Sequence, residues 1–441
     1  MPSMKTLMLS LEYSSGVGGG VGTHVQELSK GLAMAGDSVI LLSGTVGQPG
    51  HFVEGRRSIH LVAPDQHQQS GRSIVQGILD YNRTLASYAR ERILGSESSP
   101  DLIHCHNWIT FPAAVEIARA AGIPVICTIH YLSHPIEPWW GQMPDPEILS
   151  QEGDLFRSGY EFIAVSQSVR SLMRDYYSVP ERRVRVIYNA VDPELFLESS
   201  ISKESLERLR STVAPANEKI VLFTGRFHPM KGIPALLQSA ALVLQEEPDV
   251  RYLLAGQPDS KAFALEFRDL LQQNPILKQK ITFLGTLSRR RVALLYSVAD
   301  VALLPSVYDP CPYAAIEAMA AGVPLVASDG GGLAELVDHG VTGLTVPVRV
   351  HGTGLRSVDA AELAQATLAL LRDENLARKM GKAARQKAAD AYSLEIMVRF
   401  TREAYQDTLH KCRASNGAIP ATILGQGEAV EASDVTQGAH K

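Results

Sequence analysis

The sequence predicts an α/β protein with two doubly wound domains, each a parallel sheet covered by helices. Short apolar runs rich in β-branched residues alternate with helical patterns, which is the element order of a parallel sheet. The alternation restarts near Lys219, after a stretch at 189–211 where the periodicity breaks. A length of 441 residues agrees with this reading, because it fits two or three ordinary domains.

The first half opens with a buried strand at 6–11, followed by a glycine cluster at 16–22. A helix is expected next, because Val25, Leu28 and Leu32 recur at helical spacing. Further strands are expected at 39–42, 102–104, 124–129, 162–165 and 184–187.

The second half repeats this order, with a strand at 220–224 and a helix at about 233–245. Its later strands are expected at 251–255, 281–283, 301–304 and 325–327. The segment at 359–411 is rich in Ala, Leu, Arg and Lys and reads as helical, whereas the final residues carry few large apolar side chains. The expected division is an N-terminal domain at 1–195, a C-terminal domain at 196–395, a helix at 396–412 and a disordered tail at 413–441.

Composition excludes several classes of protein. Lys and Arg number 42 against 47 Asp and Glu, and this net charge of −5 argues against nucleic acid as the main partner. A run of about 18 apolar residues is absent from the sequence, so no stable membrane insertion is expected. The first apolar run is too short for a signal peptide, and the four cysteines form no C-x-x-C pair, so we expect a cytoplasmic protein with buried thiols.

Three segments carry candidate chemistry, and the first is the glycine run at 18–22. It follows a strand and opens a helix, where exposed backbone N–H groups and the helix dipole favour an anion. A phosphate-binding turn and a simple tight turn both fit this run.

The second segment places Arg226 and Lys231 after a strand end, where they could neutralise a diphosphate or could be ordinary solvated cations.

The third segment, residues 305–324, is the most specific of the three. Asp309 lies in a loop ahead of a helix expected to begin near Pro312, and Glu317 lies about one and a half turns into that helix. Two carboxylates placed in this way can accept hydrogen bonds from ligand hydroxyls. The alternative is an acid that favours the helix dipole together with a solvated Glu.

This third segment resembles the signature of the glycogen-synthase-like retaining glycosyltransferases, family 4 of the sequence classification. The similarity continues through 328–335 and 340–347, and the glycine loop at 19–24 and Tyr188–Asp192 also match family patterns. The resemblance implies the GT-B fold: two doubly wound Rossmann-like domains facing a central cleft. It places the acceptor on the N-terminal domain and the nucleotide-sugar on the C-terminal domain, and the last helix is expected to pack back on the N-terminal domain.

The resemblance also implies roles for individual residues. The catalytic set would be Arg226, Lys231 and His130, and the donor-binding set would be Gly19, Gly20, Asp309, Glu317, Gly331 and Gly332. Asp309 stands where the family usually has Glu, and Cys311 stands where it usually has Phe, which leaves the identity of the donor sugar open.

Acceptor contacts are expected from His106, Arg170 and Arg174. Ser166 is a candidate N-cap of the helix that carries both arginines, so a phosphorylated acceptor could use that helix N-terminus, although a capped, solvated helix fits as well. The Trp139–Trp140 pair fits either a sugar-stacking platform or a lid. His104 and His106 flank Cys105, but a third ligand at recognisable spacing is not apparent, so no metal is expected.

The predicted function is retaining transfer of a hexosyl group, glucose, from a UDP-sugar to a soluble acceptor, without a metal or other cofactor. A sugar phosphate such as fructose 6-phosphate is the expected acceptor, as in a sucrose-phosphate-synthase-like reaction. Glucan, lipid-linked and small-alcohol acceptors are alternatives within this class. A nucleotide-sugar epimerase and a non-catalytic nucleotide-sugar-binding protein are alternatives from other classes.

Overall fold

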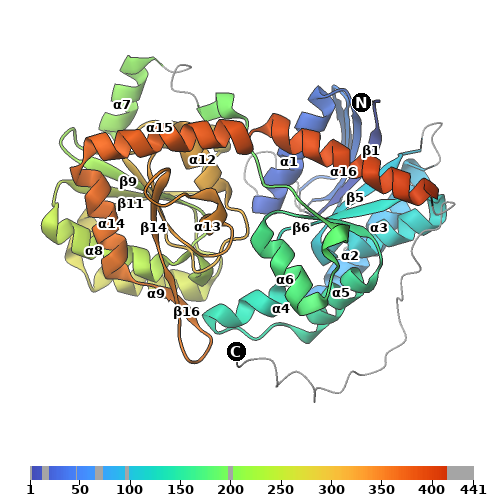
Figure 1. Cartoon of the computed structure of the whole chain (residues 1–441), viewed down its shortest axis with the longest axis horizontal. Helices are drawn as coiled ribbons and strands as arrows, with labels where there is room; N and C mark the ends of the chain where they lie inside the picture. The colour runs from blue at the N-terminus through green and yellow to red at the C-terminus, as the bar shows by residue number, and fades with distance from the viewer. Residues whose placement is uncertain are drawn as a thin grey trace.

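One mostly parallel sheet and one fully parallel sheet form two lobes that lie side by side (Figure 1). The structure, a computed structural model, describes residues 2–11, 19–45, 47–64, 73–94, 99–196 and 202–414. The side chains of Trp140, Ala262 and Glu266 lie outside this description. Residues 16–18 of the predicted glycine cluster and residues 415–441 of the predicted tail also lie outside it.

The N-terminal lobe has an eight-stranded sheet in the order β3-β4-β2-β1-β5-β6-β7-β8. Its strands are β1 (Lys5–Ser10), β2 (Ser38–Gly44), β3 (Gly50–Glu54), β4 (Arg57–Val62), β5 (Leu102–His106), β6 (Val125–Ile129), β7 (Glu161–Ala164) and β8 (Val184–Val186). The pairing of β3 with β4 is antiparallel, and the other pairs are parallel. The exposed edge strand β3 was not predicted, because it lacks a buried apolar face.

Helices cover both faces of this sheet. They are α1 (Gly20–Met34), α2 (Ile74–Arg92), α3 (Asn107–Ala121), α4 (Ser133–Ile136), α5 (Pro146–Arg157) and α6 (Gln167–Tyr177). Alternation along β1 sends Met8 into the apolar cluster that holds Leu28 of α1, and sends Leu7 and Leu9 into the cluster that holds Phe111 of α3. Burial of both faces explains why the strands read as continuous apolar runs.

The C-terminal lobe has a six-stranded, fully parallel sheet in the order β11-β10-β9-β12-β13-β14. Its strands are β9 (Lys219–Thr224), β10 (Val250–Ala255), β11 (Ile281–Gly285), β12 (Val301–Leu304), β13 (Leu325–Ser328) and β14 (Gly343–Val346). Its helices are α7 (Lys203–Val213), α8 (Ile233–Glu246), α9 (Lys261–Gln272), α10 (Pro275–Lys280), α11 (Arg289–Tyr296), α12 (Tyr313–Ala321) and α13 (Leu333–Leu336). The strand order reverses direction between β9 and β12, and ligands of open α/β sheets bind at such a switch point. The two predicted doubly wound sheets are confirmed.

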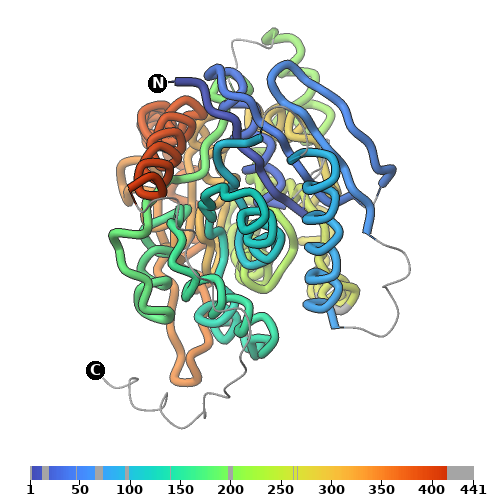
Figure 2. Tube along the Cα trace, turned by 90° about the vertical axis from the view of Figure 1, so that its right-hand side faces the viewer, coloured from blue at the N-terminus to red at the C-terminus, as the bar shows by residue number. Residues whose placement is uncertain are grey.

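Three helices at the end of the described chain connect the lobes. α14 (Ala360–Arg372) and α15 (Glu374–Ala391) pack on the C-terminal lobe, and α16 (Leu394–Ala414) packs on α1 (Figure 1). The chain crosses between the lobes where Val191 N donates to Tyr392 O at 3.1 Å and Leu394 N donates to Val191 O at 2.9 Å. Figure 2 shows α16 beside the start of the chain, where Arg402 Nη2 donates to Pro2 O at 3.1 Å.

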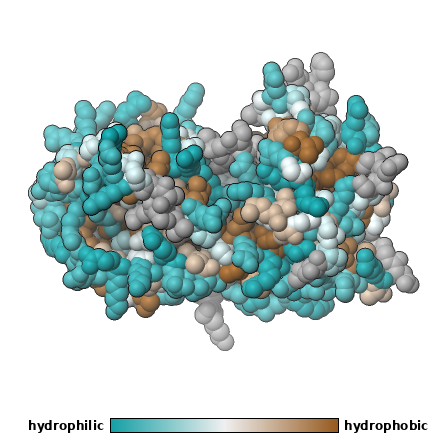
Figure 3. All heavy atoms as spheres, turned by 90° about the horizontal axis from the view of Figure 1, so that it is seen from above, coloured by the Kyte–Doolittle hydropathy of each residue, from teal (hydrophilic) through white to brown (hydrophobic). Residues whose placement is uncertain are grey.

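A hairpin of β15 (Val348–Val350) and β16 (Arg356–Val358) extends from the C-terminal lobe toward α4 (Figure 1). The surface seen from above is mostly hydrophilic, with separate hydrophobic patches (Figure 3). Within the described ranges, none of the helices combines the length and apolarity that crossing a membrane requires.

Candidate functional site

Loops at the carboxyl ends of strands from both sheets supply the candidate site. In the N-terminal lobe, Gly19 precedes α1, His106 ends β5 and His130 follows β6. In the C-terminal lobe, Gly225 follows β9 and the segment that carries Asp309 follows β12. Parallel strands present all these ends along one edge of each sheet, which explains how residues far apart in sequence reach one site.

Asp309 and Lys231 form an ion pair in the C-terminal lobe. Lys231 is 19% exposed and Asp309 is 8% exposed, so water screens the pair only in part. The Asp309 loop is held by backbone contacts, because Asp309 N donates to Gly330 O at 3.2 Å and Gly332 N donates to Asp309 O at 2.7 Å. The site thus presents one ammonium and one carboxylate from fixed loops.

Glycine is required where these loops meet. A Cβ at Gly332 would lie 2.0 Å from Pro310 O, and one at Gly331, whose φ is +68°, would lie 2.5 Å from the ring of Tyr308. A Cβ at Gly232 would lie 1.9 Å from Pro305 O, and that residue also has a positive φ of +67°. Gly331 and Gly332, predicted to bind the donor, therefore shape the loop that carries Asp309.

Glu317 lies on α12 and is buried beside Arg289. Arg289 Nε lies 3.4 Å from Glu317 Oε1, and the same guanidinium pairs with Glu27 of α1, in the other lobe. Burial raises the pKa of Glu317, and the charge of Arg289 opposes that rise. Arg289 thus joins the two lobes through the carboxylate that was predicted to bind ribose. The sequence predicts that this helix begins near Pro312, and the structure has it begin at Tyr313, one residue later.

Arg289 and Glu27 were not predicted to belong to the site. The sequence does contain an indication that Arg289 has an acidic partner, because α11 begins with three consecutive arginines at 289–291. The N-terminus of a helix disfavours positive charge, so arginines there indicate acidic partners outside the helix. Sequence alone could not show that such a partner lies on α1.

Arg226 is an exposed side chain at the end of β9. Its charge reaches Tyr131 in the opposite lobe: burial raises the pKa of that phenol, and Arg226 lowers it. Arg226 is thus near enough to Tyr131 of the N-terminal lobe for their charges to interact, and its role in binding a diphosphate stays a prediction.

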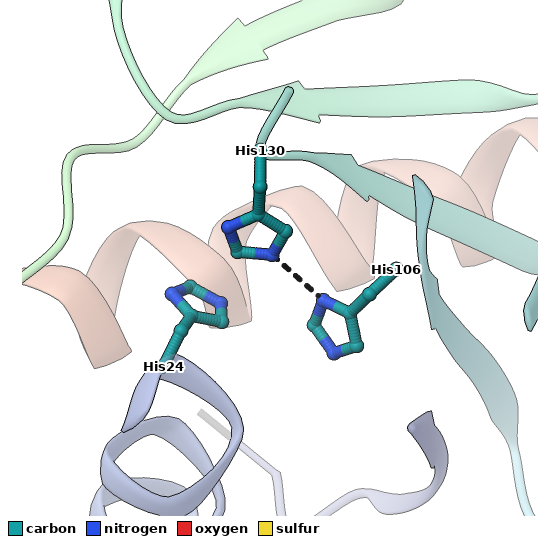
Figure 4. A group of neighbouring side chains, drawn as sticks. All are labelled: His24, His106 and His130. Atoms are coloured by element: carbon teal, nitrogen blue, oxygen red, sulfur yellow. Dashed lines mark hydrogen bonds between the residues drawn. The ribbon is translucent and has the colours of Figure 1, made fainter. Parts of the chain in front are cut away.

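His130 lies in a cluster of buried histidines with His24 and His106 (Figure 4). His106 Nδ1 and His130 Nε2 share a hydrogen bond of 3.1 Å, and His24 Nδ1 donates to Asn189 Oδ1 at 3.0 Å. Burial lowers the pKa of His24 to about 4 and lowers those of His106 and His130 well below 6.5. These rings are therefore neutral at pH 7 and act through hydrogen bonds or lone pairs.

Asn189 connects this cluster with the C-terminal lobe. Its Nδ2 donates to Cys311 O at 2.7 Å, two residues beyond Asp309, while its Oδ1 accepts from His24. The sequence identified Asn189 only as part of an interdomain pattern. The structure shows that it lies between the two halves of the site.

The N-terminus of α6 has a different partner from the predicted one. Glu335 of the C-terminal lobe accepts from Gln167 N at 2.9 Å and from Ser168 N at 2.7 Å. Ser166 caps the helix as expected, since its side chain accepts from Val169 N at 3.2 Å. Because a carboxylate already takes the free amides, this helix end is not the anion site that the sequence suggested.

The two arginines of α6 lie in different surroundings. Arg174 is exposed and pairs with Asp175 at 2.7 Å and Glu181 at 3.0 Å, which argues against its predicted contact with the acceptor without testing it. Its charge is neutralised by neighbours of its own lobe. Arg170 is half-buried one turn earlier.

Trp139 packs across the space between the lobes. Arg356 of β16 lies over its ring, 3.3 Å from the centroid, and Tyr308 meets it edge-on at 5.0 Å. Both side chains that contact the Trp139 ring belong to the C-terminal lobe. The arrangement favours the lid over the sugar-stacking platform.

Two protein families match this chain. The family described as "Glycosyltransferase Family 4" matches residues 18–195, and "Glycosyl transferases group 1" matches residues 206–387. Each match covers one lobe.

Curated proteins show the same similarity. An uncharacterized glycosyltransferase of Methanocaldococcus jannaschii is 30% identical over 348 residues, which cover 78% of this chain and 85% of that protein. The glycogen synthase of Mycobacterium tuberculosis is 28% identical over 416 residues, covering 91% of this chain and 94% of the synthase.

Solved structures share the fold. The sucrose-phosphate synthase of Thermosynechococcus elongatus superposes with a TM-score of 0.77 at 22% identity, over 92% of this chain and 100% of that chain. Anabaena HepE, solved in complex with UDP-glucose, superposes with a TM-score of 0.71 at 20% identity, again over 92% and 100% of the two chains.

Proposed function

Since the chain belongs to the glycosyltransferases with the GT-B fold, we propose that it transfers a glucosyl group from UDP-glucose to a soluble carbohydrate acceptor, with retention of anomeric configuration. The observation that carries the proposal is the set of Lys231, Asp309 and Glu317 at the carboxyl edge of the C-terminal sheet. This set combines a cation for a diphosphate with two carboxylates for hydroxyls. HepE, which shares the fold, binds UDP-glucose.

Departure of UDP from the anomeric carbon places negative charge on the β-phosphate. Lys231 and Arg226 stabilise that charge, with the amides of Gly19 and Gly20 at the start of α1. The diphosphate takes part of the Lys231 interaction away from Asp309, and the freed Asp309 oxygens accept hydrogen bonds from hydroxyls of the sugar. Binding and leaving-group activation thus use the same ammonium.

In this proposal the Glu317 carboxylate accepts hydrogen bonds from both ribose hydroxyls. In the structure, Arg289 donates to the same carboxylate and also pairs with Glu27 of α1. Nucleotide binding to Glu317 therefore changes the contact through which Arg289 joins α12 to α1. The neutral imidazole of His130 hydrogen-bonds a sugar hydroxyl from the N-terminal side. The chemistry needs no metal, because the charge that develops on the phosphate meets side-chain cations.

Retention follows if the acceptor attacks from the face that UDP leaves. The departing phosphate then accepts the proton of the acceptor hydroxyl, and the new glycosidic bond forms as the old one breaks. We assign no covalent nucleophile among the described side chains.

The acceptor is proposed to be a carbohydrate such as fructose 6-phosphate, with a glucan as the alternative. The sucrose-phosphate synthase with the same fold favours the first, and the glycogen synthase relative favours the second. His106 shares a hydrogen bond with His130, so it remains in the proposed acceptor set with Arg170.

The experiment is a matrix of UDP-, ADP- and GDP-sugars against fructose 6-phosphate, fructose and maltooligosaccharides, with products identified by mass spectrometry. We expect a new hexosyl product with UDP-glucose, and its absence from a Lys231→Met control. Donor consumption without a product of added hexosyl mass would refute the transferase proposal. A product with fructose equal to that with its phosphate would refute the sugar-phosphate assignment alone.

A further inference from the structure

The cluster of His24, His106 and His130 has the spacing of a ligand set. One ring nitrogen from each side chain lies within 4.8 Å of the others, and the His106 and His130 nitrogens are 3.1 Å apart. Two imidazoles bound tetrahedrally to one Zn²⁺ ion have nitrogens about 3.3 Å apart, given bonds of about 2.0–2.1 Å. The closest pair therefore already has the separation of two ligands, and His24 needs a shift of about 1.5 Å at most.

Two nitrogens of this cluster are buried without a partner. Among the residues that the structure describes, neither His24 Nε2 nor His106 Nε2 has a hydrogen-bond partner. Both side chains are only 2% exposed, so water does not readily replace the missing bond. A buried polar atom without a partner is costly and calls for an explanation, and an ion bound to His24 Nε2 is one for that atom. His106 faces His130 with Nδ1, so the same ion would not account for His106 Nε2.

The surroundings of His24 are those of a metal ligand. Its Nδ1–H donates to Asn189 Oδ1 at 3.0 Å, which leaves the lone pair on Nε2. Metal-binding histidines commonly donate their other N–H to a carbonyl or carboxylate in this way, because the bond fixes the tautomer and the ring orientation. Asn189 would serve as the outer-shell partner.

His104 supports the cluster without being available to it. It donates or accepts at both nitrogens, with Tyr405 OH and Thr128 Oγ1 each at 2.7 Å. Its ring lies 4.5 Å from that of His106. The cluster therefore has three candidate ligands, the number of protein ligands in an open zinc site, and His104 packs beside them in a fixed position.

We propose that His24, His106 and His130 bind a divalent transition-metal cation that prefers imidazole ligands, of the Zn²⁺ class. The ion replaces the His106–His130 hydrogen bond and takes the lone pair of His24 Nε2. It also withdraws His130 from substrate, so it inhibits transfer. That last consequence rests on the proposed function, whereas binding does not.

The test uses the full chain, dialysed first against a chelator and then titrated with Co²⁺, whose visible absorption reports its coordination. We expect one equivalent to bind, with an intense low-coordinate spectrum that Zn²⁺ abolishes by displacement. His24→Gln and His106→Gln should each weaken binding by about 100-fold or more, since loss of an outer-shell partner alone costs about 10–100-fold. Binding is measured independently of turnover, so failure of the transferase proposal leaves this result readable.

His51→Gln is the matched control, because His51 stacks on His60 at 4.2 Å and offers a competing surface pair. It should leave the Co²⁺ titration unchanged. The proposal would be overturned if the wild-type protein bound no Co²⁺, or if both cluster variants bound Co²⁺ as tightly as the wild type. If the cluster variants do not fold, anomalous scattering from a Co²⁺-soaked wild-type crystal decides: a peak between the three rings supports the site, and any other result rejects it.

Discussion

Replacing Lys231 with Met tests the assignment of the leaving-group cation. The ammonium pairs with Asp309 in a site where the two side chains are only 19% and 8% exposed. At an effective dielectric constant of about 20, a charge pair about 4 Å apart contributes about 4 kcal/mol before desolvation, and a single donor to a developing anion is worth about 3 kcal/mol. We therefore expect kcat to fall by about 10²-fold or more.

The same substitution also leaves Asp309 without its partner. Removing one member of a buried pair costs about 3–5 kcal/mol, and partial exposure reduces this to about 2–3 kcal/mol of unfolding free energy. The double variant Lys231→Met/Asp309→Asn should recover most of the stability but none of the turnover. This separates the catalytic effect from the structural one.

The assay is steady-state UDP release at saturating donor and acceptor, together with denaturant unfolding of each variant. Lys261→Met is the control, because Lys261 is exposed at the start of α9 and should change stability by less than about 0.5 kcal/mol and leave kcat unchanged. Wild-type kcat in a folded Lys231→Met variant would refute the reasoning.

Other predictions concern single side chains. Glu317→Gln should weaken UDP binding by about 10-fold or more in calorimetry, and unchanged affinity would remove its ribose role. Glu335→Gln should lower the unfolding free energy by about 1–2 kcal/mol, because two amides of α6 lose a charged acceptor; equal melting temperatures would contradict this. Arg174→Ala should leave the acceptor KM unchanged, since its charge is already paired, and a raised KM would restore the sequence-based assignment. Burial and the charge of His51 lower the pKa of His60 to about 4. As the pH falls from about 6.5 toward 4, His60 is therefore protonated in the unfolded chain but stays neutral in the folded chain, which lowers the stability. Between pH 7 and pH 5 a shift of this size would cost about 2 kcal/mol of stability, and solvent screening at the half-buried ring reduces this to about 1 kcal/mol. His60→Gln should flatten that part of the pH dependence in denaturant titrations.

Much of the fold was predictable because most strands of both sheets are parallel and buried. Strands with two apolar faces, such as β9 and β12, have continuous apolar sequences that are followed by glycine or proline. The edge strand β3 and the β15–β16 hairpin have exposed positions and no such pattern, so local sequence does not distinguish them from loops.

Contacts between the lobes were the part of the site that sequence could not supply. Glu27 and Glu335 read as ordinary helix acids, and their partners Arg289 and the α6 amides lie in the other lobe. The histidines show the same limit, because His24, His106 and His130 are on three separate elements with no ligand-like spacing. Only the convergence of strand ends brings them together.

Proton NMR of the reaction with UDP-α-glucose and fructose 6-phosphate tests the central claim most directly. It reports the release of UDP and the anomeric configuration of the new glycoside in one measurement. The account predicts stoichiometric UDP and an α-linked product. A β-linked product, or UDP release with free glucose as the only partner product, would contradict it.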